Sequence, residues 1–200
     1  MPRSYRMKKR AVAHGEVRER ILRATMSIHD EKGVAPTTYA DVAGRAGIGV
    51  ATVYRHFPKI GDLIMACGGH AWQAMQPPTP DAAAAIFSGL RTHRERMLRL
   101  VQELDAFYER GSLRLGLASR DRDIVPELHG FLSAVEAGTE AMVREALKPE
   151  DLPEKTIQVT LALMSFAAWQ AFRRQRLTAD DTTEAQLRLL DSAISSARKE

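Results

Sequence analysis

Apolar side chains recur every three or four residues along most of this 200-residue chain, which is the period of an α-helix. In the first stripe Val17, Ile21, Ala24 and Ile28 share one face, and Gly33 follows as a helix end. The pattern predicts an all-α fold with about nine helices. The predicted helices cover residues 16–32, 38–46, 50–57, 60–75, 81–110, 113–119, 126–147, 157–172 and 181–197.

Breaks in this pattern predict the domain organisation. The first 15 residues are basic and lack apolar periodicity, which is typical of a flexible arm. The proline-rich run at 76–80 interrupts the helices and marks a domain boundary. The expected parts are an arm (1–15), a first compact domain (16–59), a connecting helix (60–76) and a larger second domain (77–200).

Residues 37–57 carry the most specific local pattern in the chain. Thr38 is a suitable helix N-cap, and Asp41, three residues later, can complete a capping box with Asp in the usual Glu position. Gly47 follows that helix where a left-handed backbone is favoured, and Gly49 precedes a second helix. The stretch therefore predicts two short helices joined by a tight turn.

The second of these helices has a composition suited to a DNA groove. Val53 anchors one face, and the polar groups are Thr52, Tyr54, Arg55 and His56. Hydroxyl and imidazole groups donate to phosphates, and arginine can read guanine with two hydrogen bonds. Two helices with a short glycine-containing turn form a helix-turn-helix, whose second helix enters the major groove. The alternative is a plain helical hairpin with a polar face.

The segment GIGVATVYRHFP at residues 47–58, followed by Asp62 and Leu63, resembles the recognition segment of the TetR family of bacterial transcriptional regulators. The resemblance implies an all-α homodimer with an N-terminal three-helix DNA-binding domain. It also implies a larger C-terminal domain that binds an effector and dimerises, with the helix at 60–76 joining the two domains.

The same resemblance implies roles for single residues. Thr38 would contact a phosphate from the start of the second helix, and Tyr54 and His56 would hold phosphates. The residues that would face base edges or the adjacent backbone are Val50, Ala51, Thr52 and Arg55.

Two positions depart from the family pattern. The residue before the recognition helix is usually a polar cap, and here it is Gly49, which caps nearly as well but offers no side-chain contact. The family usually places lysine two residues after the proline, where this chain has Ile60. Lys59 is the nearby cation and the candidate for that phosphate contact.

Charge is distributed unevenly along the chain, although the net charge is only +4. Residues 1–59 contain twelve Lys or Arg and five Asp or Glu, whereas the rest of the chain contains 17 and 20. A positive lobe beside a mildly negative one is typical of a polyanion-binding module on a separate body. RNA or a membrane surface would satisfy the charge alone, but the helix-turn-helix favours duplex DNA.

Composition limits the remaining classes. The basic N-terminus is followed by no apolar segment, so we expect no signal peptide and a cytoplasmic protein. One cysteine, Cys67, excludes a cysteine-cluster metal site within the chain, and a packed helical thiol is the expected role. The sequence carries no nucleophile elbow, phosphate-cradling loop or metal-ligand spacing. We therefore expect no enzyme activity, catalytic residue, metal site or cofactor.

The later helices suggest a binding and dimerisation body. Residues 157–172 are apolar nearly all round, so this helix needs cover on more than one side. The resemblance implies that the last two helices of two chains form a four-helix bundle. Candidates for an effector pocket, each of which could instead be ordinary core, are His93, Phe107, Tyr108, Phe131, Met142, Met164, Phe166 and Trp169.

These features favour a dimeric regulator, most simply a repressor that binds a palindromic operator and is released by a small-molecule effector. Its partners would be operator DNA, a second copy of the chain and an unidentified effector. The alternative is an architectural or partner-binding protein that uses the same DNA-binding helices without an effector.

Overall fold

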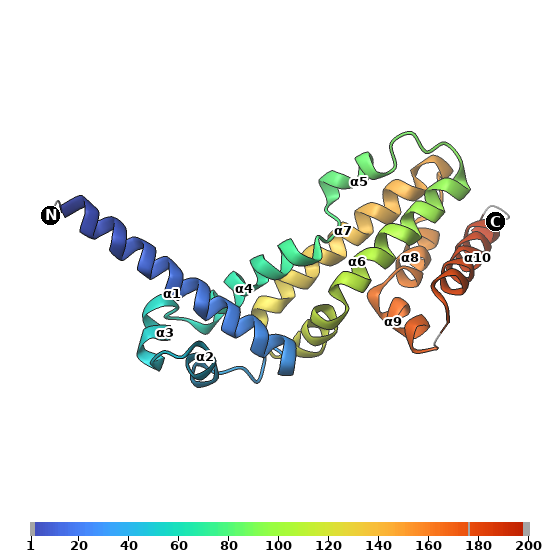
Figure 1. Ribbon diagram of the computed structural model, residues 1–200. Helices are drawn as coiled ribbons and strands as arrows, with labels where there is room; N and C mark the ends of the chain where they lie inside the picture. The colour runs from blue at the N-terminus through green and yellow to red at the C-terminus, as the bar shows by residue number, and fades with distance from the viewer. Residues whose placement is uncertain (1–2, 176, 198–200) are drawn as a thin grey trace. The chain divides into compact units, whose positions relative to one another are not determined.

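A computed structural model describes residues 3–175 and 177–197, with side chains from residue 12 onward (Figure 1). Within these residues the chain forms ten α-helices, one 3-10 helix and no strand. The all-α class is therefore confirmed. The chain divides into two compact units, one made of Met1–Ala74 with Gly116–Phe131 and the other of Met75–Leu115 with Leu132–Glu200.

The first unit is a small helical domain. Its helices are α1 (Arg3–Lys32), α2 (Tyr39–Ala46), α3 (Val50–His56) and most of α4 (Ile60–Met75). They enclose one buried cluster, which consists of Ile21, Leu22, Ile28, Val42, Ala43, Val53, Phe57, Leu63 and Cys67. Burial raises the pKa of the Cys67 thiol to about 12, so this side chain packs as a neutral apolar group.

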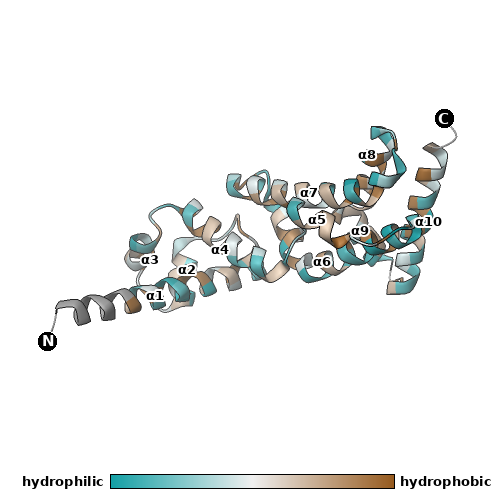
Figure 2. Ribbon diagram, turned by 90° about the horizontal axis from the view of Figure 1, so that it is seen from above, coloured by the Kyte–Doolittle hydropathy of each residue, from teal (hydrophilic) through white to brown (hydrophobic). Residues whose placement is uncertain are grey.

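The second unit is a larger helical bundle. Its elements are α5 (Pro80–Ile86), α6 (His93–Asp121), α7 (Pro126–Leu147), η1 (Lys148–Glu150), α8 (Glu154–Leu163), α9 (Phe166–Arg174) and α10 (Ala179–Ala197). The C-terminal end of α6 and the N-terminal end of α7 belong to the first unit. Helix α10 shows apolar brown segments between polar teal ones in Figure 2, as expected of a helix with one face in the core.

Local signals predicted several helices closely. The bounds predicted for α4 and α7 coincide with the observed ones, and those of α2 and α3 agree within one residue. Each of these helices has its stop signal in the adjoining sequence, such as the glycine after α2 or the proline run after α4.

The predicted beginning of the first helix is wrong. Helix α1 begins at Arg3 rather than Glu16, so the backbone expected to be a flexible arm is helical from that point. Gly15 lies within the helix and does not interrupt it. A single glycine weakens a helix by about 1 kcal/mol relative to alanine, which an otherwise uninterrupted helix tolerates.

The predicted helix over 81–110 begins within one residue of α5, but it is wrong in its middle and at its C-terminal end. The chain leaves the helix after Ile86, turns at Gly89 with φ +80°, and re-enters at His93. Gly111 was predicted to end this helix, but α6 continues through it to Asp121. The helix predicted over 113–119 is therefore part of α6. A Cβ at Gly111 would lie 3.0 Å from the Met75 sulfur, so this glycine permits close packing rather than a helix end.

One further predicted helix, over 157–172, is two helices in the structure. Helix α8 ends at Leu163, and Ser165 caps α9 by accepting a hydrogen bond from the Ala168 N–H at 3.2 Å. This break accounts for the difference between the predicted nine helices and the observed ten, because the two helices predicted over 81–119 are also two in the structure, α5 and α6. Serine inside an apolar run was the available signal, since serine is a preferred N-cap.

Candidate nucleic-acid interface

The N-terminal end of α2 has the predicted capping box. The Thr38 hydroxyl oxygen accepts from the Asp41 N–H at 3.2 Å, and the Thr38 N–H donates to the Asp41 carboxylate at 2.9 Å. Lys32 and the Thr38 hydroxyl also donate to that carboxylate, at 2.8 and 2.7 Å. These hydrogen bonds, led by that from Lys32, hold the pKa of Asp41 well below its usual range. The start of α2 is thereby fixed before any ligand arrives.

The turn between α2 and α3 depends on two glycines. Gly47 has φ 63° and ψ 42°, a left-handed conformation, and its N–H bonds back to the last turn of α2. Gly49 is the N-cap of α3 in an extended conformation, and no side chain caps that helix. The Gly49 carbonyl oxygen accepts from the Thr52 and Val53 N–H groups at 2.8 and 3.4 Å, so the backbone alone begins this helix.

Helix α3 presents most of the predicted contact residues on its exposed side. Val50 and Tyr54 are 40% and 49% exposed, and Ala51 and Arg55 are also exposed, whereas Val53 is fully buried. Arg55 donates from Nη2 to the Thr52 hydroxyl oxygen at 3.0 Å, which holds the guanidinium along the helix. The structure thus brings these predicted side chains together on one short helix.

A tyrosine that the sequence pattern did not single out supports this surface. The Tyr39 ring contacts the Tyr54 ring at a centroid distance of 4.2 Å, and the Tyr39 hydroxyl donates to the Phe57 carbonyl oxygen at 2.8 Å. Tyr39 therefore ties the start of α2 to the C-terminal half of α3. Its position directly after the Thr38 cap gave no hint of contacts with α3.

His56 lies at the junction of α1 and α3. Its ring is 4.1 Å from that of His14, and its Nδ1 is buried without a hydrogen-bond partner among the described residues. Burial, followed by the positive charges of His14, Arg55 and Arg18, lowers the pKa of His56. The imidazole is therefore neutral at neutral pH.

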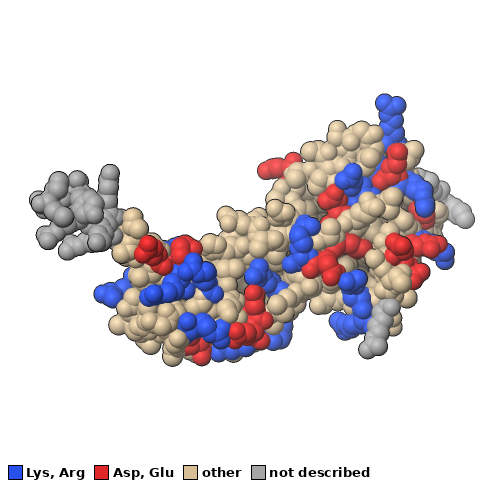
Figure 3. Space-filling model, viewed as in Figure 1, with Lys and Arg blue, Asp and Glu red and all other residues tan. Residues whose placement is uncertain are grey.

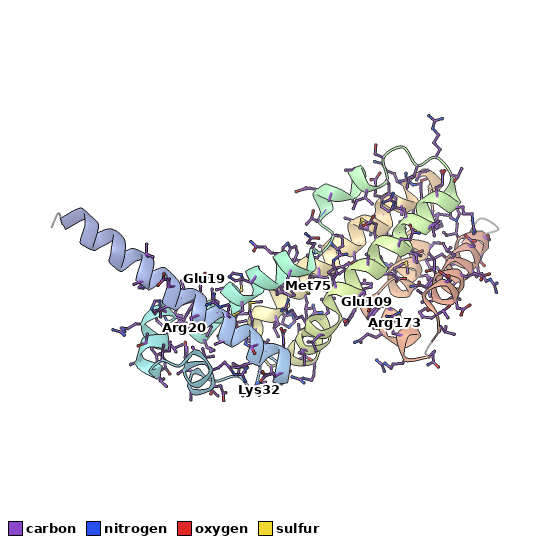
Figure 4. All side chains as sticks on the ribbon, viewed as in Figure 1. Glu19, Arg20, Lys32, Met75, Glu109 and Arg173 are labelled. Carbon is purple, nitrogen blue, oxygen red and sulfur yellow. The ribbon has the colours of Figure 1, made fainter. Side chains whose placement is uncertain are left out.

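Several cations of the first unit are already paired with acids. Arg45 forms a fork with the Glu31 carboxylate at 2.6 and 2.7 Å, and Lys32 pairs with Asp41. Lys59 and Arg20 are exposed. Blue side chains gather over the first unit in Figure 3, and Figure 4 labels Arg20 and Lys32 there. The basic character predicted from sequence is present on this surface, partly neutralised by local acids.

Two residues at the end of α6 hold the connection between α1 and α2, the corner at residues 33–38. The Asp121 carboxylate, 2% exposed, accepts from the Val34 and Ala35 N–H groups at 2.7 and 3.0 Å. Arg120 donates to the Lys32 carbonyl oxygen at 2.8 Å and also pairs with Asp121. Burial would raise the pKa of Asp121, but the hydrogen bonds from Arg120 and the two amides outweigh it and lower the pKa. Sequence reasoning missed this pair because it lies 86 and more residues from the corner.

The predicted pocket residues fall into three groups. The rings of Phe107, Tyr108, Phe166 and Trp169 form one cluster with centroid distances of 5.1 to 6.0 Å. The Tyr108 hydroxyl donates to the Met164 carbonyl oxygen at 2.8 Å, and burial raises the pKa of Tyr108 to about 12. Met142 and Met164 are buried core residues.

The other two candidates lie apart from this cluster. His93 contacts the Glu150 and Asp191 carboxylates at 3.1 Å each, so its ring links α6 to η1 and α10. Phe131 belongs to the first unit, where it meets the Trp72 ring edge to face at 5.9 Å. Among the described residues, no group of three His, Cys, Asp or Glu side chains could hold a metal ion, and no helix is long and apolar enough to cross a membrane.

Residues 21–67 match the family described as bacterial regulatory proteins, tetR family. This segment contains the capped turn and α3. Over this segment, about a quarter of the chain, the sequence is similar to the TetR family. Over 73 residues it is 36% identical to the HTH-type transcriptional repressor KstR of Mycolicibacterium smegmatis, a match that spans 36% of each chain.

Solved structures with the same fold cover most of the chain. A Clostridium perfringens protein named as a fatty acid metabolism regulator aligns over 86% of this chain and 97% of its own, with a TM-score of 0.60 and 14% identity. The multidrug binding protein EbrR, solved with imidazole, aligns over 87% and 89%, with a TM-score of 0.59 and 21% identity. At these identities the likeness shows the fold alone, over the 86% and 87% of the chain that align.

Proposed function

We propose that this protein is a DNA-binding transcription regulator of the TetR family, most simply a repressor, that binds a palindromic operator as a dimer. The observation that carries the proposal is the pre-formed helix-turn-helix, in which the capped α2 and the glycine turn present α3 with its polar side chains outward. A helix presented in this way fits the major groove.

The proposed DNA contacts follow from this geometry. Arg55 and Thr52, with Val50 and Ala51, would face base edges or the neighbouring backbone, and Tyr54 would hold phosphates. The contacts proposed for the remaining residues are all with phosphate: His56, Lys59, Thr38 and the backbone at Gly49. Thr38 already donates its hydroxyl hydrogen to Asp41, so a phosphate would have to replace that bond.

Dimerisation through the last helices is part of the proposal. Helices α8 and α10 pack on each other, and each exposes a large apolar side chain, Val159 and Leu189, both 43% exposed. A second copy covering these side chains would place two α3 helices for two half-sites of one operator. Leu189→Glu should dissociate the dimer in analytical ultracentrifugation, whereas Leu113→Glu, at an exposed apolar site on α6, should not.

Regulation by a small molecule would act through a shift in populations. An effector that binds better to a conformation with wrongly spaced α3 helices lowers the share of DNA-competent dimer. The first unit would then be the DNA-binding domain, α4 the connecting helix and the second unit the effector-binding and dimerisation domain. Such a protein would act in the cytoplasm beside the chromosome and would not be an enzyme.

Fluorescence anisotropy with DNA flanking the protein's own gene tests this function. We expect tight, dimer-stoichiometric binding that a scrambled duplex does not match at any salt concentration. Arg55→Ala should weaken operator binding about tenfold, since a bidentate base contact is worth about 1–3 kcal/mol. The matched control is Arg188→Ala on the surface of α10. Equal, salt-sensitive binding to both duplexes would contradict sequence-specific regulation.

A further inference from the structure

Helix α10 carries two polar side chains on its buried face, among leucines and an isoleucine. Thr182 and Gln186 are each 3% exposed, whereas Leu187, Leu190 and Ile194 supply the rest of that face. The Thr182 hydroxyl oxygen and the Gln186 Oε1 are buried without a hydrogen-bond partner among the described residues. Buried polar atoms are normally paired, so two such atoms one helical turn apart call for an explanation.

The partner that Gln186 does have is an acid. Its Nε2 donates to the Asp105 carboxylate of α6 over a long 3.4 Å. No cation lies within ion-pair distance of Asp105 in the described part of the chain, because the neighbouring Arg173 pairs with Glu109 at 2.8 Å (Figure 4). Burial, the largest effect, raises the pKa of the Asp105 carboxyl despite the hydrogen bond from Gln186 and the charge of Arg173.

These three groups have a common requirement. The Asp105 carboxylate and the Gln186 Oε1 are acceptors, and the Thr182 hydroxyl can accept as well as donate. Among the described residues no donor reaches the Gln186 Oε1 or the Thr182 hydroxyl oxygen, and Asp105 receives one long hydrogen bond. Within the same residues the Asp105 carboxylate also has no positively charged group within ion-pair distance. A protonated amine supplies both, because an ammonium group has up to three donors and one positive charge.

An aromatic cluster begins one helical turn from Asp105, at Tyr108. Tyr108 follows Asp105 by three residues on α6, and the Asp105 charge is close enough to affect its pKa. The Tyr108 ring lies 5.5 and 6.0 Å from the rings of Phe166 and Trp169, which stack on each other with an angle of 17° between their planes. Aromatic faces attract cations and pack against flat apolar groups.

We propose that Asp105, Thr182 and Gln186 form a binding site for a small organic cation, with its ammonium group on the Asp105 carboxylate and the Gln186 Oε1. The apolar body of the cation packs against Tyr108, Phe166 and Trp169. This inference rests on the proposed function, since it names the chemical class of the effector. It adds three polar residues that the sequence did not identify as pocket candidates.

The test compares three probes of similar shape and different charge: 2-phenylethylamine, which is cationic, 2-phenylethanol, which is neutral, and 3-phenylpropionate, which is anionic. Binding is followed by tryptophan fluorescence in a Trp72→Phe variant, which leaves Trp169 as the remaining tryptophan. We expect saturable quenching by the amine in the millimolar range or tighter. The alcohol and the acid should bind at least about tenfold more weakly.

Two variants and one control localise the effect. Asp105→Asn and Gln186→Leu should each weaken binding of the amine about tenfold, because one removes the charge and the other an acceptor. Glu103→Gln removes a charge from the exposed side of α6, where it pairs with Arg99, and should leave binding unchanged. Thermal unfolding of each variant shows that the fold is intact before binding is compared.

Several outcomes would overturn the site. They are equal binding of amine and alcohol, unchanged binding by Asp105→Asn, and no saturable quenching below about 10 mM. An ordered water that bridges Thr182 and Gln186 in a crystal structure, without amine binding, would also overturn it. Operator binding is measured on the same samples: DNA binding without amine binding contradicts this site alone, whereas loss of sequence-specific DNA binding contradicts the proposed function.

Discussion

Helix α6 carries two carboxylates in opposite situations. Asp121, near its C-terminal end, receives two backbone amides and Arg120, and its pKa is lowered. Asp105, sixteen residues earlier by number, has one long amide hydrogen bond, and its pKa is raised. Asp121 is buried and Asp105 is half-buried, and burial acts to raise the pKa of both, so burial alone does not explain their opposite pKa shifts. The difference lies in how many donors the protein itself supplies.

This difference separates a structural role from a binding role. Asp121 fixes the corner through which α1 leads into α2 and α3, and its acceptors are fully used by the chain. Asp105 and the unpartnered atoms of α10 keep acceptors that the chain does not use. Proteins commonly accept such local instability at binding sites, where a ligand completes the hydrogen bonds.

The largest expected effect on stability comes from removing the Asp121 carboxylate, whose acceptors all have donors. Asp121→Ala leaves the Val34 and Ala35 amides without an acceptor and should lower the free energy of unfolding by about 3 kcal/mol. Chemical denaturation measures this loss. Asp123→Ala, an exposed acid two residues later, should change stability by less than about 0.5 kcal/mol. Equal effects of the two variants would mean that the corner is not held by Asp121.

The pH dependence of stability should provide a second test of the Asp121 carboxylate. A group whose pKa is lower in the folded state binds more protons when unfolded, so its stabilisation is complete above the unfolded pKa and is lost as pH falls through the folded one. Stability of the wild type should therefore fall below about pH 4, near the ordinary pKa of aspartate. Asp121→Asn should show a shallower fall over that range. Parallel pH profiles would contradict the lowered pKa.

Removing the unpartnered Thr182 hydroxyl should have a smaller effect on stability, of opposite sign. Thr182→Val removes a buried hydroxyl that has no partner and should stabilise the protein by about 1 kcal/mol. The matched control is Thr160→Val, because the Thr160 hydroxyl is fully buried and donates to the Thr156 carbonyl oxygen at 2.9 Å. That variant should be destabilised by about 0.5–1.5 kcal/mol. Denaturation curves in which both variants lose stability would show that Thr182 has a partner in solution.

The smallest effect is expected at Asp105. Because its pKa is raised in the folded state, its charged form opposes folding, and stability should decrease as pH rises through the folded pKa. Asp105→Asn should remove this pH dependence and raise stability at neutral pH by less than about 1 kcal/mol, since solvent screens part of the effect. Saturating 2-phenylethylamine should stabilise the wild type more than Asp105→Asn. A less stable Asp105→Asn protein would contradict the contrast with Asp121.

Short-range signals made much of the helix-turn-helix predictable. The Thr38–Asp41 capping box, the left-handed Gly47 and the exposed side of α3 depend on residues three or four apart. Prediction was poorer where one residue type serves two purposes. Gly111 resembles a helix end in the sequence but permits close packing of Met75, and Gly89 begins a turn that the apolar stripe of α6 concealed.

The sequence by itself therefore determined the helical class and the helix-turn-helix, because periodicity, caps and turns depend on neighbours in the chain. It also determined the positive charge of residues 1–59, which follows from composition alone. Tertiary structure alone brought Asp121 to the α1–α2 corner, 87 residues from Val34, and Gln186 to Asp105 across 81 residues. Hydrogen bonds of this kind depend on the path of the folded chain. Local sequence does not indicate which distant donor will reach a carboxylate, or which carboxylate will be left without one.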